Sequence, residues 1–193
     1  ELLIWSYNTY ILYKNSIINI LKHQVKDIMK FTKNLNSLSE NEFISIFGSV
    51  FEKSEWIASD TFKKKPFKNS KDLMDKMINT YSNTSNEKIL KIFNLHPKLA
   101  IEKKLTSFSS KEQSDAKLNT CTKDELIEFE KLNFDYKKKF NFPFIIAVKG
   151  KNKEDILNNF RERINNDYQK EFTEAKTQVM KIALFRLNEI LEN

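Results

Sequence analysis

Residues 166–191 read NDYQKEFTEAKTQVMKIALFRLNEIL and predict one long helix at the C-terminal end of the chain. The stretch contains neither glycine nor proline. At about 100° per residue, one of its faces collects an almost entirely apolar stripe. The stripe consists of Phe172, Ala175, Val179, Ala183, Arg186 and Ile190. This pattern is typical of an amphipathic helix that packs on a protein core.

Arg186 breaks this stripe, because it places a guanidinium in the middle of an apolar face. An unpaired charge is prohibitively costly to bury. The side chain therefore either forms a structural buried ion pair, extends its charged end to solvent, or reaches into a polar cavity. In a cavity it would act as a clamp for an anion or a carbonyl group. The residues alone leave these alternatives open.

The composition predicts an all-α, single-domain helical bundle. The chain has 193 residues, enough for one domain with a substantial core, and its sixteen phenylalanines supply much of the core material. Only two glycines (Gly48 and Gly150) and three prolines are present. An all-β fold of this length would need many more turn residues, and a nucleotide-binding α/β fold would need a glycine-rich loop.

Capping signals divide the chain into helices before residue 166. The expected N-terminal caps are Ser39, Ser70, Ser85, Thr122 and Asn152. We expect helices to end near Gly48 and Leu95, a loop over residues 60–70 and a polar, irregular stretch over residues 103–121. The apolar run 142–148 is short and flanked by proline and glycine, which favours a buried extended segment.

Residues 1–34 are expected to form an N-terminal helical extension of one or two amphipathic helices, separate from the domain at 35–193. We favour packing of this extension on the domain or on a second copy of the chain over a partner-binding or membrane-surface helix. The chain does not begin with methionine, so we expect it to be a fragment of a longer protein.

The net charge of +7 could indicate nucleic-acid binding. The lysines are spread along the chain, however, and no aromatic-interleaved basic motif is present. We therefore interpret the charge as a solvated surface that helps attract a small anionic substrate, with no nucleic-acid partner. No segment reaches about 18 uninterrupted apolar residues, so we expect no membrane span.

The single cysteine, Cys121, excludes an intrachain disulfide and favours a reducing compartment. We interpret it as a structural thiol, since no base that could activate it is evident nearby. With only His23 and His96 as histidines, a structural zinc cluster is excluded and no metal site is expected.

His96 is the only histidine of the predicted domain, between an amphipathic helix and Pro97. A side chain at such a junction can face a cavity, but on position alone a structural or surface histidine is the more common case. Glu112 and Gln113 follow in the polar stretch, and an acid beside an amide is equally unspecific by itself.

Taken in order, these pieces carry a family resemblance over roughly residues 36–191. The motifs are Leu95-His96-Pro97-Lys98-Leu99-Ala100, Ser109-Ser110-Lys111-Glu112-Gln113, Phe142-Pro143-Phe144-Ile145-Ile146-Ala147-Val148 and Lys181-Ile182-Ala183 through Arg186-Leu187. The chain resembles the 2-oxo-4-hydroxy-4-carboxy-5-ureidoimidazoline (OHCU) decarboxylases. The run around Phe142-Pro143-Phe144 is the most specific piece.

The resemblance implies a helical, cofactor-free enzyme, often a homodimer, that converts this ureidoimidazoline to (S)-allantoin in urate breakdown. It implies His96 as the catalytic acid/base, assisted by Glu112. The implied substrate-binding residues are Pro97, Ser109, Ser110, Lys111, Gln113, Phe144, Ile145, Ile146, Ala147, Val148 and Arg186. A cytoplasmic location is expected, with a peroxisomal one as the alternative although no such signal is visible in this chain.

The chain departs from the family pattern directly after Gln113. The family usually has a Gly-Ala-Gly-Leu run there, whereas this chain has Asp115-Ala116-Lys117-Leu118; Asn141 also replaces a glycine before Phe142. The alternative function is therefore a catalytically degenerate homologue that serves as a helical binding or scaffold module. Side chains of Asp115 and Lys117 filling the pocket would favour that alternative.

Overall fold

The computed structural model describes residues 34–101 and 105–192, together with Lys14 and Ile18. Within these residues the fold is entirely helical, without strands, as the composition predicts. None of the described helices is long and apolar enough to cross a membrane. Most of the predicted N-terminal extension lies outside the described residues, so it stays a prediction.

The described helices follow one another along the chain, with longer connections between α5 and α6 and between α7 and α8. In order they are α2 (Glu40–Phe47), α3 (Trp56–Phe62), α4 (Ser70–Ser82), α5 (Asn86–Phe93), α6 (Ser107–Asp115), the 3₁₀ turn η1 (Leu118–Thr120), α7 (Lys123–Phe140), α8 (Lys153–Arg163) and α9 (Tyr168–Glu192).

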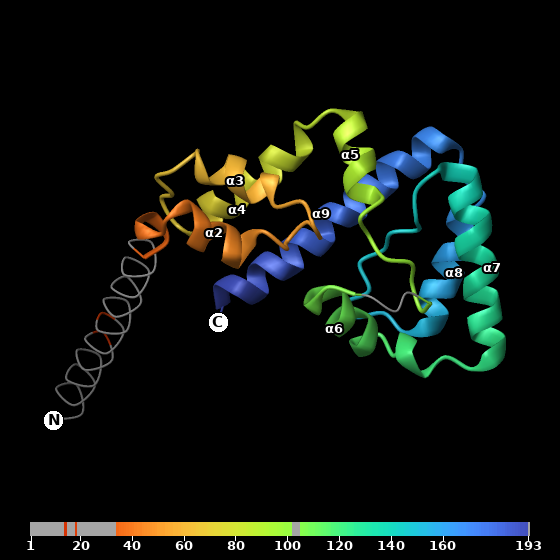
Figure 1. Cartoon of the computed structure of the whole chain (residues 1–193). Coiled ribbons are helices and arrows are strands. Elements are labelled where there is room, and N and C mark those ends of the chain that lie inside the picture. The colour runs from red at the N-terminus through yellow and green to blue at the C-terminus, as the bar shows by residue number, and fades with distance from the viewer. Residues whose placement is uncertain (1–13, 15–17, 19–33, 102–104, 193) are drawn as a thin grey trace, which may run out of the picture.

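The long helix α9 organises the bundle. Its 25 residues span about 38 Å and cross the molecule diagonally in Figure 1. It packs against α4, α5 and α7. The predicted stripe lies on its buried face: Phe172, Ala175, Val179, Ala183 and Arg186 are buried, and Ile190 is partly buried. A single amphipathic helix thus joins the two halves of the bundle.

The predicted caps set most helix starts. The side chains of Ser39, Ser85, Thr122 and Asn152 accept hydrogen bonds from main-chain N–H groups of the first helical turn. One predicted cap is wrong: Asn69, not Ser70, caps α4, since its side chain accepts from the N–H of Asp72. The predicted 60–70 loop also begins slightly later, because α3 continues to Phe62.

The prediction of an irregular stretch over residues 103–121 is wrong where it covers α6 and η1. Thr106 caps α6 through the N–H of Ser109. This helix carries no apolar stripe, because the two residues that it buries are the polar Ser109 and Gln113. Hydrophobic periodicity therefore gave no sign of it.

The segment 142–148 is buried, as predicted, and forms neither helix nor strand. Because it has no neighbouring strand, side chains must satisfy its main chain. The Arg163 guanidinium donates to the carbonyl of Ile145 at 2.9 Å, and the Gln178 amide oxygen accepts from the N–H of Ala147 at 2.9 Å. Arg163 is itself paired with the fully buried Glu171 at 2.5 Å.

Two positions where the family usually has glycine adopt left-handed backbone conformations. Asn141 ends α7 with φ of 61°, and Lys117 precedes η1 with φ of 59°. Asparagine tolerates this region, whereas a lysine there is strained by its Cβ. The third such position, Asp115, is the last residue of α6 and is right-handed helix.

The strain at Lys117 predicts that Lys117→Gly stabilises the protein by about 1 kcal/mol, because glycine adopts positive φ without a steric cost. Urea denaturation measures the change. Lys117→Ala is the matched control: it removes the same side-chain charge but keeps Cβ, so its free energy of unfolding should stay close to that of the wild type. Equal effects of both substitutions would contradict this explanation.

Candidate active site

A small interior cavity lies where the 95–100 connection, α6, the segment 142–148 and α9 meet. Its volume is about 30 Å³, and its lining includes His96, Glu112 and Arg186. The remaining lining residues are Glu52, Pro97, Leu99, Ser109, Gln113, Phe144, Ile145, Ile146, Val148 and Ile182. Groups far apart in the sequence thus border one space, which we call the inner cavity.

A larger cavity of about 650 Å³ adjoins it, which we call the outer cavity. The two share Glu112, Val148, Ile182 and Arg186 as walls. The inner cavity has room for about one water molecule, whereas the outer one is in the size range of small-ligand sites. Glu112 and Arg186 therefore stand at the boundary between them.

Three substrate-binding candidates lie off the inner cavity. Lys111 and Ala147 line the outer cavity instead. Ser110 is exposed and lines neither of the two. Conversely, the inner cavity contains Glu52, Leu99 and Ile182, which were not predicted. Glu52 lies in the loop between α2 and α3, where no periodic pattern marks it.

His96 sits just beyond the end of α5 and is buried. Its Nδ1 lies 3.1 Å from the main-chain carbonyl oxygen of Ile92. Since a carbonyl only accepts, Nδ1 carries the proton of the neutral ring, and Nε2 is the unprotonated nitrogen. Burial lowers the pKa of His96, against the opposing charge of Glu52. The resting side chain is therefore a neutral imidazole that can accept a proton.

Helix α6 presents Ser109, Glu112 and Gln113 to the cavity, because residues three and four apart share a helix face. The Gln113 amide oxygen accepts from the N–H of Ala100 at 3.0 Å. Its Nε2 is buried and has no hydrogen-bond partner among the described residues. A buried amide N–H without a partner is costly, which makes it a candidate donor to a ligand carbonyl.

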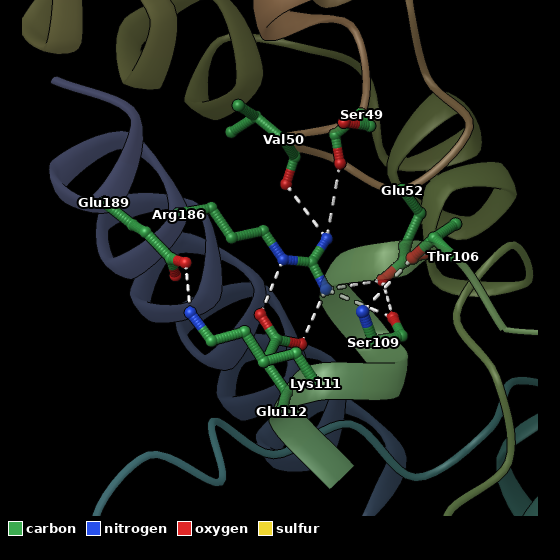
Figure 2. A network of polar contacts seen from close by, with 9 residues as sticks. All are labelled: Ser49, Val50, Glu52, Thr106, Ser109, Lys111, Glu112, Arg186 and Glu189. Carbon is green, nitrogen blue, oxygen red and sulfur yellow. Dashed lines mark hydrogen bonds and ion pairs between the residues drawn. The ribbon is translucent and has the colours of Figure 1, made fainter. Parts of the chain in front are cut away.

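Arg186 is 2% exposed and bonded on every side (Figure 2). Its Nε and Nη2 each donate to the Glu112 carboxylate at 2.7 Å. Nη2 also donates to Glu52 at 2.7 Å and to the Ser109 hydroxyl at 3.2 Å. Nη1 faces the α2–α3 loop, at 3.4 Å from the Ser49 carbonyl and 3.3 Å from that of Val50. The alternative in which this side chain extends to solvent is wrong.

Glu52 is as deeply buried as Arg186, at 2% exposure. Its backbone adopts φ of 54°, in the left-handed region. The Ser109 hydroxyl donates to it at 2.6 Å and the Thr106 hydroxyl at 3.1 Å. Burial opposes ionisation, but the charge of Arg186 and the hydrogen bond from the Ser109 hydroxyl outweigh it, so the pKa of Glu52 is lowered. Glu52 is therefore a buried carboxylate anion.

No group of three or more histidine, cysteine, aspartate or glutamate side chains could hold a metal ion in the part of the chain that the structure describes. Cys121 is partly buried and lines neither cavity. Burial raises the pKa of its thiol, which disfavours the nucleophilic thiolate.

The family model for OHCU decarboxylase matches residues 36–188. A 2-oxo-4-hydroxy-4-carboxy-5-ureidoimidazoline decarboxylase from Halalkalicoccus jeotgali is 34% identical over 158 residues, which cover 82% of this chain and 90% of that protein. The chain belongs to the OHCU decarboxylase family. The resemblance predicted from the His-Pro, Glu-Gln and Phe-Pro-Phe motifs is thereby confirmed.

Other relatives place the family domain in longer proteins. A uric acid degradation bifunctional protein of Bacillus sp. strain TB-90 is 42% identical over 158 residues. The match covers 82% of this chain, which spans only 32% of the length of that protein. Among solved structures, a crystal structure of (S)-allantoin synthase is 27% identical with a TM-score of 0.68, covering 82% of this chain and 53% of that one. A crystal structure of OHCU decarboxylase in the presence of (S)-allantoin has a TM-score of 0.63 at 24% identity, covering 80% of this chain and 100% of that one, so it shares the fold.

The Arg186 network predicts a large stability loss for Glu52→Ala. Removing one partner leaves a buried guanidinium with one of its counter-charges gone, which costs about 3–5 kcal/mol. Urea denaturation measures this loss. Glu128→Ala is the control, since Glu128 also pairs with an arginine, Arg161, but does so on the surface. Its loss should stay below about 1 kcal/mol, and similar losses for both variants would contradict the expectation.

Burial of neutral His96 predicts that acid destabilises the folded protein through this residue. The unfolded chain binds the histidine proton near its ordinary pKa of about 6.5, whereas the folded chain binds it only at lower pH. The free energy of unfolding therefore falls by up to about 1.4 kcal/mol per pH unit below about pH 6.5. In His96→Gln this contribution should be absent. If the free energy of unfolding changed with pH in the same way in both proteins, the prediction would be contradicted.

Proposed function

We propose that this chain catalyses the decarboxylation of OHCU to (S)-allantoin in urate breakdown. The observation that carries the proposal is the inner cavity of a family member, where Glu112 and Gln113 of α6 meet His96, which follows α5, and Arg186 of α9. A proton donor or acceptor, an amide donor and a cation are the groups that this reaction needs.

The bonds that change follow from the structure of the substrate. Its ring carries a carboxylate and a hydroxyl on C4, and C5 bears the ureido group and a double bond to N1. When carbon dioxide leaves C4, the bonding pair forms a C4=C5 double bond and the C5=N1 pair moves to N1. Protonation of N1 and C5, with loss of the hydroxyl proton, gives allantoin. The net change is one proton taken up for each carbon dioxide released.

His96 is the proposed proton-transfer group. Its neutral resting form, with Nε2 unprotonated, can accept the proton of the 4-hydroxyl and return it to the ring. Delivery to one face of C5 would set the (S) configuration. Glu112 would hold the hydroxyl or the imidazole in position for this transfer.

The remaining groups would orient the substrate. The unpartnered Nε2 of Gln113 is placed to donate to a ring carbonyl. Arg186 would bind an oxygen of the substrate and stabilise developing negative charge. The main chain of residues 144–148, together with Pro97 and Ser109, would complete the lining. Ser110 and Lys111 would contribute from the rim rather than by contact in the inner cavity.

We also propose that the reaction needs no cofactor. The C=N bond of the substrate ring accepts the electron pair left behind by carbon dioxide, a role for which other decarboxylases use an organic cofactor. The protein then has to orient the carboxylate, stabilise charge and deliver a proton.

The degenerate-homologue alternative gains no support from the geometry that would favour it. Neither Asp115 nor Lys117 lines the inner cavity, and only Asp115 lines the outer one. A homodimer and a cytoplasmic location remain proposals that rest on the family resemblance.

The proposal predicts that fresh product of urate oxidation, mixed with this protein, yields (S)-allantoin faster than in buffer. His96→Ala should lower kcat at least about a hundredfold, because it removes the proton-transfer group. Chiral chromatography or circular dichroism of the product measures both rate and configuration.

Glu125→Gln serves as the control. It removes a carboxylate that pairs with Lys153 at 2.7 Å, away from both cavities, and should leave kcat unchanged. Racemic allantoin formed at the rate of buffer, or a fully active His96→Ala variant, would refute the proposed function.

A further inference from the structure

Arg186 has all five of its N–H groups engaged, and they divide into two sets. One set faces inward, to Glu52 and to the carbonyls of Ser49 and Val50. The other is the edge formed by Nε and Nη2, which the Glu112 carboxylate occupies with two bonds of 2.7 Å. This outer edge is the planar, two-donor surface with which an arginine binds a carboxylate. In this structure the protein's own glutamate occupies it.

The two glutamates on Arg186 differ in how firmly they are held. Glu52 is 2% exposed and receives further hydrogen bonds from the hydroxyls of Thr106 and Ser109. The side chain of Glu112 is 27% exposed, and it borders both cavities. Glu112 can therefore turn away from the guanidinium into the outer cavity or solvent, whereas Glu52 does not line the outer cavity and is almost fully buried.

The charges at the site limit how an anionic substrate can bind. One guanidinium already faces two carboxylates, so adding a third carboxylate without loss of another would place two uncompensated negative charges around it. Exchange avoids this cost, because a substrate carboxylate that replaces Glu112 on the outer edge leaves the charge at the guanidinium unchanged. The inner cavity of about 30 Å³ is too small for a ureidoimidazoline.

This inference rests on the proposed function. We infer that Glu52 is a positioning residue and that Glu112 is a latch, by which we mean a side chain that occupies the carboxylate-binding edge of Arg186 until the substrate displaces it. Glu52 stays paired with Arg186 and fixes the guanidinium, while the substrate carboxylate displaces Glu112 from the outer edge. Displacement joins the two cavities through their shared wall. It also frees Glu112 to hydrogen-bond the substrate, so one movement both admits the substrate and completes the site.

Binding of two stable probes tests the exchange without turnover. Allantoate carries a carboxylate beside two ureido groups, whereas allantoin is uncharged and lacks the carboxylate. Isothermal titration calorimetry compares their affinities for wild type, Glu112→Gln and Glu52→Gln. The two variants lose the same charge from the same guanidinium, so they serve as matched controls for each other.

We expect Glu112→Gln to bind allantoate at least about tenfold more tightly than wild type, because the competing carboxylate is gone. Its affinity for allantoin should not rise by the same factor. Glu52→Gln should not gain affinity for allantoate. An equal gain in both variants would mean that net charge alone governs binding, and no gain in Glu112→Gln would overturn the latch.

A crystal structure of the wild-type protein with allantoate tests the same inference without a buried substitution. We expect Glu112 off the guanidinium and Glu52 still bonded to it; Glu112 retained on Arg186 would overturn the proposal. The allantoin-forming assay separates the two claims. Formation of allantoin without the expected differences in allantoate affinity would refute the latch but not the decarboxylase function. The expected differences in affinity without formation of allantoin would refute the decarboxylase function and leave a carboxylate-binding site.

Discussion

The buried guanidinium of Arg186 is the constraint on which the site depends. A charge placed in the middle of the core face of α9 must find counter-charges inside the protein. It finds them on the α2–α3 loop, through Glu52, and on α6, through Glu112. Satisfying one side chain therefore brings three elements together, and the place where they meet is one wall of the inner cavity.

A second buried arginine, Arg163, holds another wall of the inner cavity. The segment 142–148 cannot satisfy its main chain through helix or sheet bonds, so Arg163 donates to the carbonyl of Ile145. Arg163 is held in turn by Glu171, whose carboxylate also accepts from the Tyr136 hydroxyl and from Asn166 at 2.7 Å. The guanidinium lies 4.5 Å from the centre of the Phe144 ring. Polar groups thus fix both walls in the interior of an otherwise apolar bundle.

Helix α6 shows why the site was harder to predict than the fold around it. Its inward residues Ser109 and Gln113 are polar, so it lacks the apolar period by which helices such as α9 are predicted. The same polarity is what equips the cavity to bind a polar substrate. A functional helix therefore departs from the pattern that marks structural ones, which is expected where a site replaces part of a core.

The sequence by itself determined the helical class, most caps, the stripe of α9 and the buried run at 142–148, because these depend on local spacing and backbone preference. With the family resemblance it also singled out His96, Glu112 and Arg186. Only the tertiary structure decided that Glu52 joins them, that Ser110 and Lys111 do not line the inner cavity, and that Arg186 holds two carboxylates of unequal exposure. Those facts depend on which side chains meet across distant segments, because a buried charge is paired by groups that are close in space and need not be close in the sequence.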